Sequence, residues 1–69
     1  MINIYEREDG RFRVTINVYK KGIELQFSFF VHQSCSVSNL RIVQRLMESD
    51  DMNWDDVYEM AMICQEGRW

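Results

Sequence analysis

The sequence predicts an α+β fold in which a three-stranded antiparallel β-meander precedes two α-helices packed on one face of the sheet. Two patterns predict this order. Apolar residues alternate with polar ones up to Val31, which is the period of half-buried strands. From Val37 onward they recur at helical spacing instead. Because the chain has only 69 residues, we expect a single small domain spanning 1–69.

The three expected strands are separated by two turns that contain glycine. Their alternating apolar residues are Ile2 and Ile4, then Phe12, Val14, Ile16 and Val18, and finally Ile23, Leu25, Phe27, Phe29 and Val31. A two-residue loop at Asp9-Gly10 would turn Ile4 to the wrong face. A loop of residues 8–10 with Gly10 in the left-handed conformation places Ile4 opposite Val14. A two-residue loop at residues 21–22 pairs Val18 with Leu25, so both hairpins bury one common face.

The helical half begins after a serine-rich stretch. One of Ser34, Ser36 or Ser38 is expected to cap the first helix, and Asn53 to cap the second. Gly67 suits the end of the second helix. The residues expected to face the core are Val37, Leu40, Val43, Leu46 and Met47 in the first helix and Trp54, Val57, Tyr58, Ala61 and Cys64 in the second.

Negative charge gathers in the second half of the chain. The formal net charge is −3, yet residues 46–67 contain seven carboxylates and no Lys or Arg. Asp55 and Asp56 lie in the first turn of the second helix, where the helix dipole favours each by about 0.3–1 kcal/mol. Glu48, Asp50 and Asp51 lie at or beyond the end of the first helix, where the dipole disfavours them.

The acidic residues admit two interpretations. They form a solvated face that keeps the protein in solution, or a surface that docks on a basic protein partner and can occupy a groove meant for phosphates. On the second helix the stripe has one apolar member, Met62, whose flexible side chain suits an adaptable contact. The candidate acidic surface comprises Glu48, Asp50, Asp51, Asp55, Glu59, Met62 and Glu66.

The opposite face of the sheet carries aromatic and basic residues. The register puts Tyr5, Arg13 and Phe30 in one cross-strand row, with three further basic residues expected close by. The candidate sheet-face patch is Tyr5, Arg7, Arg11, Arg13, Phe30 and His32. Such a row stabilises a sheet through cation–π contacts, and it also suits a protein-binding patch or stacking on single-stranded nucleic acid.

The third strand is expected to lie at the edge of the sheet. It carries no formal charge after Glu24, and Phe27, Phe29 and Phe30 follow along it. An uncharged, apolar edge invites pairing with another chain. This pattern predicts a homodimer formed through the third strand, with Phe30 outside the core.

Residues with catalytic or metal-binding chemistry are sparse. His32 and Cys35 have no second histidine or nearby thiol, so neither a zinc site nor a Cys/His nucleophile is expected. Gly10, Gly22 and Gly67 are too dispersed for a phosphate-binding loop. We therefore predict no catalytic residues, no metal and no cofactor.

The sequence also bears on location. Its longest uncharged run, residues 25–40, is too polar for a membrane span, and no signal peptide is visible. Two cysteines outside any CxxC motif are typical of free thiols in the cytoplasm, although Cys35 and Cys64 can pair if the fold brings them together. A cytoplasmic protein without membrane contact is expected.

In size, acidity and lack of chemical motifs, the chain resembles the small inhibitor proteins of phages and mobile elements, including anti-CRISPRs. That resemblance implies a non-enzymatic inhibitor or modulator of a larger partner, active in the cytoplasm of the host cell. The three-stranded sheet followed by a helix is also similar to the small sheet-reading DNA-binding modules of some phage integrases, which implies the alternative of a nucleic-acid-binding regulator. Those modules are basic overall, whereas this chain is acidic.

Overall fold

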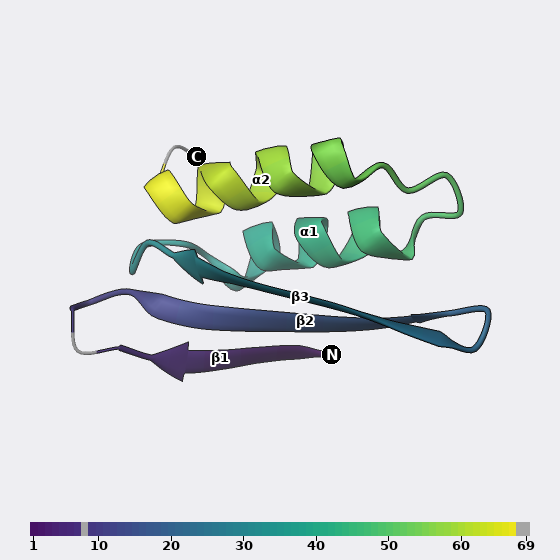
Figure 1. The fold of residues 1–69 in the computed structure, drawn as a ribbon. Helices are drawn as coiled ribbons and strands as arrows, with labels where there is room; N and C mark the ends of the chain where they lie inside the picture. Colours follow the sequence, from purple (N-terminus) through teal and green to yellow (C-terminus); the bar gives the residue numbers. More distant parts are fainter. Residues whose placement is uncertain (8, 68–69) are drawn as a thin grey trace.

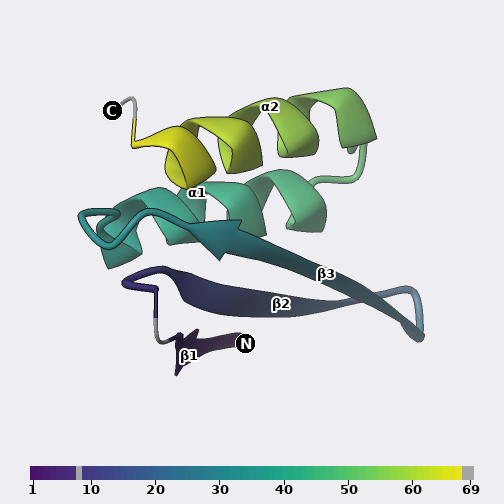
Figure 2. The same ribbon diagram turned by 60° about the vertical axis from the view of Figure 1, so that its left-hand side comes forward.

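A computed structural model describes residues 1–7 and 9–67 of the chain and shows three strands followed by two helices (Figure 1). The sheet is antiparallel with the strand order β1-β2-β3. Both helices lie on the same side of it (Figure 2). The predicted α+β fold is therefore confirmed. The elements are β1 (Ile2–Glu6), β2 (Phe12–Lys20), β3 (Ile23–Val31), α1 (Val37–Glu48) and α2 (Trp54–Glu66).

The predicted strand registers are confirmed at both hairpins. Ile4 pairs with Val14 in the first hairpin, and Val18 pairs with Leu25 in the second. The Arg7 N–H donates to the Arg11 carbonyl at 2.9 Å, which leaves residues 8–10 for the loop. Glu8, a member of that predicted loop, lies outside the described residues.

Positive φ angles explain why the two turns have different lengths. Gly10 has φ +80°, as the three-residue loop requires. In the second turn Lys21 has φ +52° and Gly22 has φ +79°. Two successive left-handed residues match the twist of the flanking strands and keep the hairpin tight. The non-glycine Lys21 adopts this conformation at a cost of about 1–2 kcal/mol.

Side chains and a glycine mark the helix ends as the sequence predicted. Ser36 caps α1, since its Oγ accepts the Asn39 N–H at 3.3 Å. Asn53 caps α2, since its Oδ1 accepts the Asp55 N–H at 2.9 Å. Gly67 ends α2 in the left-handed conformation, and its N–H donates to the Ile63 carbonyl at 3.0 Å.

The core lies between the sheet and the helical layer. Helix α1 packs over β2 and α2 packs over β3, so the layer is centred on the second and third strands. The fully buried large side chains come from β2 and both helices: Val14, Ile16, Val43, Met47, Val57 and Cys64.

Three predicted core residues lie at the margins of the core, each for a different reason. Ile4 is 47% exposed, since β1 lies outside the layer. Val37 is 50% exposed, because α1 faces the core with Leu40, Val43 and Met47. Ile23 is exposed at the hairpin tip, which extends past the helices (Figure 1). The prediction that these three side chains are buried was wrong.

Candidate protein-docking surfaces

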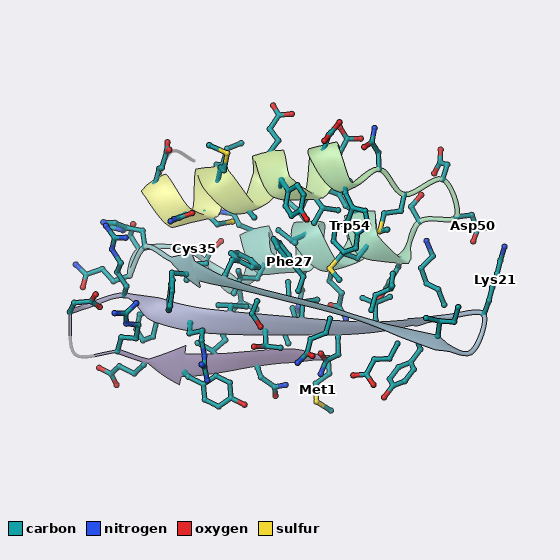
Figure 3. The ribbon with its side chains drawn as sticks, viewed as in Figure 1. Met1, Lys21, Phe27, Cys35, Asp50 and Trp54 are labelled. Atoms are coloured by element: carbon teal, nitrogen blue, oxygen red, sulfur yellow. The ribbon has the colours of Figure 1, made fainter. Side chains whose placement is uncertain are left out.

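The acidic surface predicted from the sequence lies on the exterior of the helical layer. All seven of its residues are exposed, and Met62 is 51% exposed among the carboxylates of α2. Asp50 projects from the loop between the two helices (Figure 3). Helix α2 contains no Lys or Arg, so its outer face carries negative charge alone. The surface is Glu48, Asp50, Asp51, Asp55, Glu59, Met62 and Glu66.

Asp51 has a structural role within this surface. Its carboxylate accepts a hydrogen bond from the Ser49 hydroxyl, and the Lys20 ammonium donates to the Ser49 carbonyl at the end of α1. The hydrogen bond from Ser49, its own backbone N–H and the charge of Lys20 together hold the pKa of Asp51 below its usual value. This carboxylate therefore helps to order the loop between the helices.

A small hollow adjoins the same loop. Its volume is about 120 Å³, and its lining includes the carboxylates of Asp51 and Asp56 beside Met52. Ligand sites for drug-sized molecules are typically about 300–1,000 Å³ and largely apolar. The hollow is consequently too small and too polar to bind such a molecule.

A cluster of four aromatic rings joins β3 to α2, and the sequence did not predict it. Phe27 lies at the centre, with its ring centroid 5.0 Å from that of Phe29, 6.0 Å from Trp54 and 5.4 Å from Tyr58. Trp54 and Tyr58 stack on each other at 5.7 Å. Figure 3 shows Phe27 on the sheet near Trp54 on the helix above it. We call Phe27, Phe29, Trp54 and Tyr58 the aromatic cluster.

The aromatic cluster is only partly shielded from water. Tyr58 is 50% exposed, which corrects the prediction that it belongs to the buried stripe of α2. The other three rings are partly buried. A tyrosine at the margin of a helix keeps its hydroxyl in water while its ring packs. Alternating aromatics on a strand, together with aromatics four residues apart on a helix, are the signal by which such a cluster can be recognised in a sequence.

Strand β3 forms one edge of the sheet, as predicted. In its register with β2, the main-chain groups of alternate residues point away from the sheet. These residues are Glu24, Gln26, Ser28 and Phe30. Among the described residues, none of these four takes part in a main-chain hydrogen bond beyond the strand ladders and helices.

The outer face of the sheet contains the predicted row of Tyr5, Arg13 and Phe30. The Arg13 guanidinium carbon lies 5.2 Å from the centre of the Tyr5 ring, and that of Arg7 lies 4.4 Å from the centre of the Phe30 ring. These four residues and Glu6 line a shallow hollow of about 260 Å³. Both arginines therefore already pack on aromatic rings of the domain.

The remaining members of the sheet-face patch, Arg11 and His32, do not line this hollow. His32 turns toward the end of α2, because the Cβ that a side chain would add at Gly67 would lie 3.2 Å from its ring. Its Nδ1 accepts the Ser34 N–H at 3.1 Å. That His32 shares a patch with Tyr5 stays a prediction. Arg11 is exposed in the turn that follows Gly10.

The two thiols are neighbours in the fold. Cys35, in the loop before α1, is partly buried, Cys64 on α2 is buried, and both are free cysteines. The Cys35 thiol donates to the Ser36 carbonyl at 3.6 Å. Burial and the neighbouring Cys64 thiol raise the pKa of Cys35 to about 12, and burial raises the pKa of Cys64. Because the thiolate is the reactive form, neither side chain is set up as a nucleophile.

Two further findings concern residues 1–7 and 9–67. In this part of the chain, no group of three or more His, Cys, Asp or Glu side chains is arranged to hold a metal ion. Over the same residues, neither helix has the length and apolar character needed to cross a bilayer.

Comparisons with protein families, with curated proteins and with solved structures found no match to this chain. A functional conclusion therefore depends on the surfaces described above.

Proposed function

We propose that this protein is a non-enzymatic inhibitor or modulator that docks the acidic surface of its helical layer on a larger protein with a basic surface. One observation carries the proposal: the outer face of α2 presents Asp55, Glu59 and Glu66 around an exposed Met62, with no basic residue in the helix. Depletion of positive charge around an adaptable apolar side chain is suited to binding rather than to solubility alone.

The proposed partner is a basic protein, such as a component of a complex that handles nucleic acid. A groove that binds phosphates is lined by Lys and Arg, and a row of carboxylates can occupy it in place of the nucleic acid. Exposed negative charge also accelerates the encounter with such a groove. This mode of action has the character of the small phage and mobile-element inhibitors that the sequence resembles, and it belongs in the cytoplasm, where such complexes act.

The test is capture of partners from a lysate of the source cell by wild-type protein and by an Asp50→Lys/Glu59→Lys variant. Both residues are exposed and neither caps a helix. We expect the wild type to retain a basic protein that the variant releases. Rising salt should slow the association of this protein with the variant less than its association with the wild type. The control for charge is Glu6→Lys/Asp9→Lys, which changes the charge equally at the far end of the sheet. Since Asp9 pairs with Arg7 and accepts the Arg11 N–H, circular dichroism must show that this control is folded.

Retention of the same partners by wild type and Asp50→Lys/Glu59→Lys would contradict the proposal. Under that outcome, the carboxylates serve solubility only.

The alternative function is a regulator that binds nucleic acid on the outer face of the sheet. The row of Tyr5, Arg13 and Phe30, with its adjoining hollow, supports this alternative. A mobility-shift assay at low salt with single- and double-stranded DNA and RNA distinguishes the two functions. Submicromolar binding that weakens with salt and with Arg13→Ala would favour the alternative over the docking proposal.

A further inference from the structure

The edge of β3 that points away from the sheet offers main-chain groups for a further strand. The N–H and C=O groups of Glu24, Gln26, Ser28 and Phe30 point outward, whereas those of the residues between them pair with β2. The available edge ends at His32, whose N–H donates to the Cys64 carbonyl on α2 at 3.0 Å. A bound strand can therefore extend along most of β3.

The surface above this edge is aromatic and acidic. Helix α2 packs over β3 and has α1 on its inner side, so its other flank lies above the open edge. Tyr58 is exposed there and contacts Phe27. Asp55 precedes Tyr58 by three residues and Met62 follows it by four, which puts both beside its ring on the helix surface.

We infer that this edge binds an extended, arginine-bearing segment of the partner protein, which adds to the sheet as a fourth strand. The inference rests on the proposed function and names the element of the partner that is bound. Alternate side chains of the added strand point toward the helical layer. An arginine at such a position stacks on Tyr58 and reaches the carboxylate of Asp55 or Glu59.

Charge identifies a basic segment as the occupant in preference to a second copy of this chain. Neither β3 nor α2 contains a Lys or Arg, while together they carry Glu24 and all four acidic residues of the second helix. Pairing of β3 with another β3 would bring two such negative surfaces side by side, which is unfavourable. A strand with alternating arginines supplies the missing positive charge.

The test is amide hydrogen exchange of the ¹⁵N-labelled protein, followed by NMR, with and without a short capped peptide in which arginine and valine alternate. At a concentration about 100 times its Kd, the peptide should slow exchange of the Gln26 and Ser28 amides by about tenfold or more. The Phe27 amide, which pairs with β2, and the Ile4 amide, which points outward from β1, are internal controls and should not change.

A pair of proline variants tests the same inference by affinity. Gln26→Pro removes an outward N–H of β3 and leaves the ladder with β2 intact, since proline is tolerated on such an edge position. Ile4→Pro does the same on β1. We expect Gln26→Pro to weaken peptide binding by about tenfold or more, and Ile4→Pro to leave it unchanged. The exchange experiment on wild-type protein decides the question if Gln26→Pro does not fold.

The outcomes separate this inference from the proposed function. One outcome is that Asp50→Lys/Glu59→Lys weakens peptide binding while the peptide does not slow hydrogen exchange of the Gln26 and Ser28 amides. This result would overturn strand addition but leave the proposed acidic docking in place. Slow exchange of both amides without peptide, together with a dimeric mass, would show that a second copy occupies the edge and would also overturn the inference. If the peptide does not bind at all, the inference is also overturned.

Discussion

The main-chain N–H of His32 donates a 3.0 Å hydrogen bond to the carbonyl oxygen of Cys64, joining the end of β3 to the last turn of α2. The His32 ring completes the junction by packing against Gly67, directly after that helix. Strand β3 is thereby held under α2 at one end, while its outer edge remains available along the rest of its length. Substitutions at this junction can therefore measure how much it contributes to the stability of the domain.

Gly67→Ala should destabilise the domain by about 1–2 kcal/mol. Its φ of +74° disfavours any side chain, and the new Cβ would lie 3.2 Å from the His32 ring. Gly22→Ala is the matched control, since Gly22 has a similar φ of +79° but no atom within 4 Å of the added Cβ. Urea denaturation should show a larger loss of unfolding free energy for Gly67→Ala than for Gly22→Ala. Equal losses would show that the contact with His32 contributes nothing.

Asp51 should titrate below 3.8 in an NMR pH titration of the side-chain carboxyls, because the Ser49 hydroxyl stabilises its ionised form. Since the folded pKa is depressed, its contribution to stability is present above the unfolded pKa and is lost as the pH falls through the folded value. Ser49→Ala should raise the pKa of Asp51 more than Lys20→Met does, as the hydrogen bond is the larger cause. The reverse order would make the Lys20 charge the dominant influence.

Cys35 should react slowly with iodoacetamide at pH 8 until the protein unfolds, because its pKa is raised to about 12. A raised pKa in the folded state stabilises the fold below the unfolded value near 9, and this contribution is lost as the pH rises toward 12. Wild-type protein should therefore lose more stability over that range than Cys35→Ala. Rapid alkylation of the folded protein at pH 8 is the result that contradicts this prediction.

Phe30→Lys should leave the domain folded, with a change in unfolding free energy within about 1 kcal/mol, because the ring lies on the outer face of the sheet, where the Arg7 guanidinium packs on it. Phe27→Lys, three residues earlier, should unfold it, since this side chain is the centre of the aromatic cluster.

Light scattering of the wild type tests the homodimer predicted from the sequence. A mass of 8.4 kDa at high concentration would exclude it, and a dimer should dissociate in Phe30→Lys.

Strand register was predictable because a slip of one residue would have reversed the faces of every side chain. The positions of Gly10 and Gly22 then limited each turn to one length. Helix ends were predictable for a similar reason, since Ser36, Asn53 and Gly67 satisfy main-chain groups close to them in sequence.

Residues at the margins of the core were not predictable in this way. Whether Ile4 and Tyr58 are buried depends on where the helical layer lies across the sheet, and no local pattern encodes that position. The same limit applies to His32, whose ring turns toward a glycine distant in sequence. The exposure of the acidic residues was predictable because carboxylates are costly to bury, whereas the aromatic cluster requires knowledge of which helix covers which strand.

The offset of the helical layer divides the domain into parts of unequal stability. Strand β1 pairs with β2 and lies beyond the two strands over which the helices mainly pack, and its half-buried Ile2 packs against the core. Its detachment would therefore remove only the edge of the core and leave the contacts among β2, β3, α1 and α2 in place. Such peripheral elements open at a lower free energy than the whole domain. Local unfolding is therefore expected to begin at β1, and limited proteolysis should cut the β1–β2 connection while the hairpin of β2 and β3 stays joined to both helices.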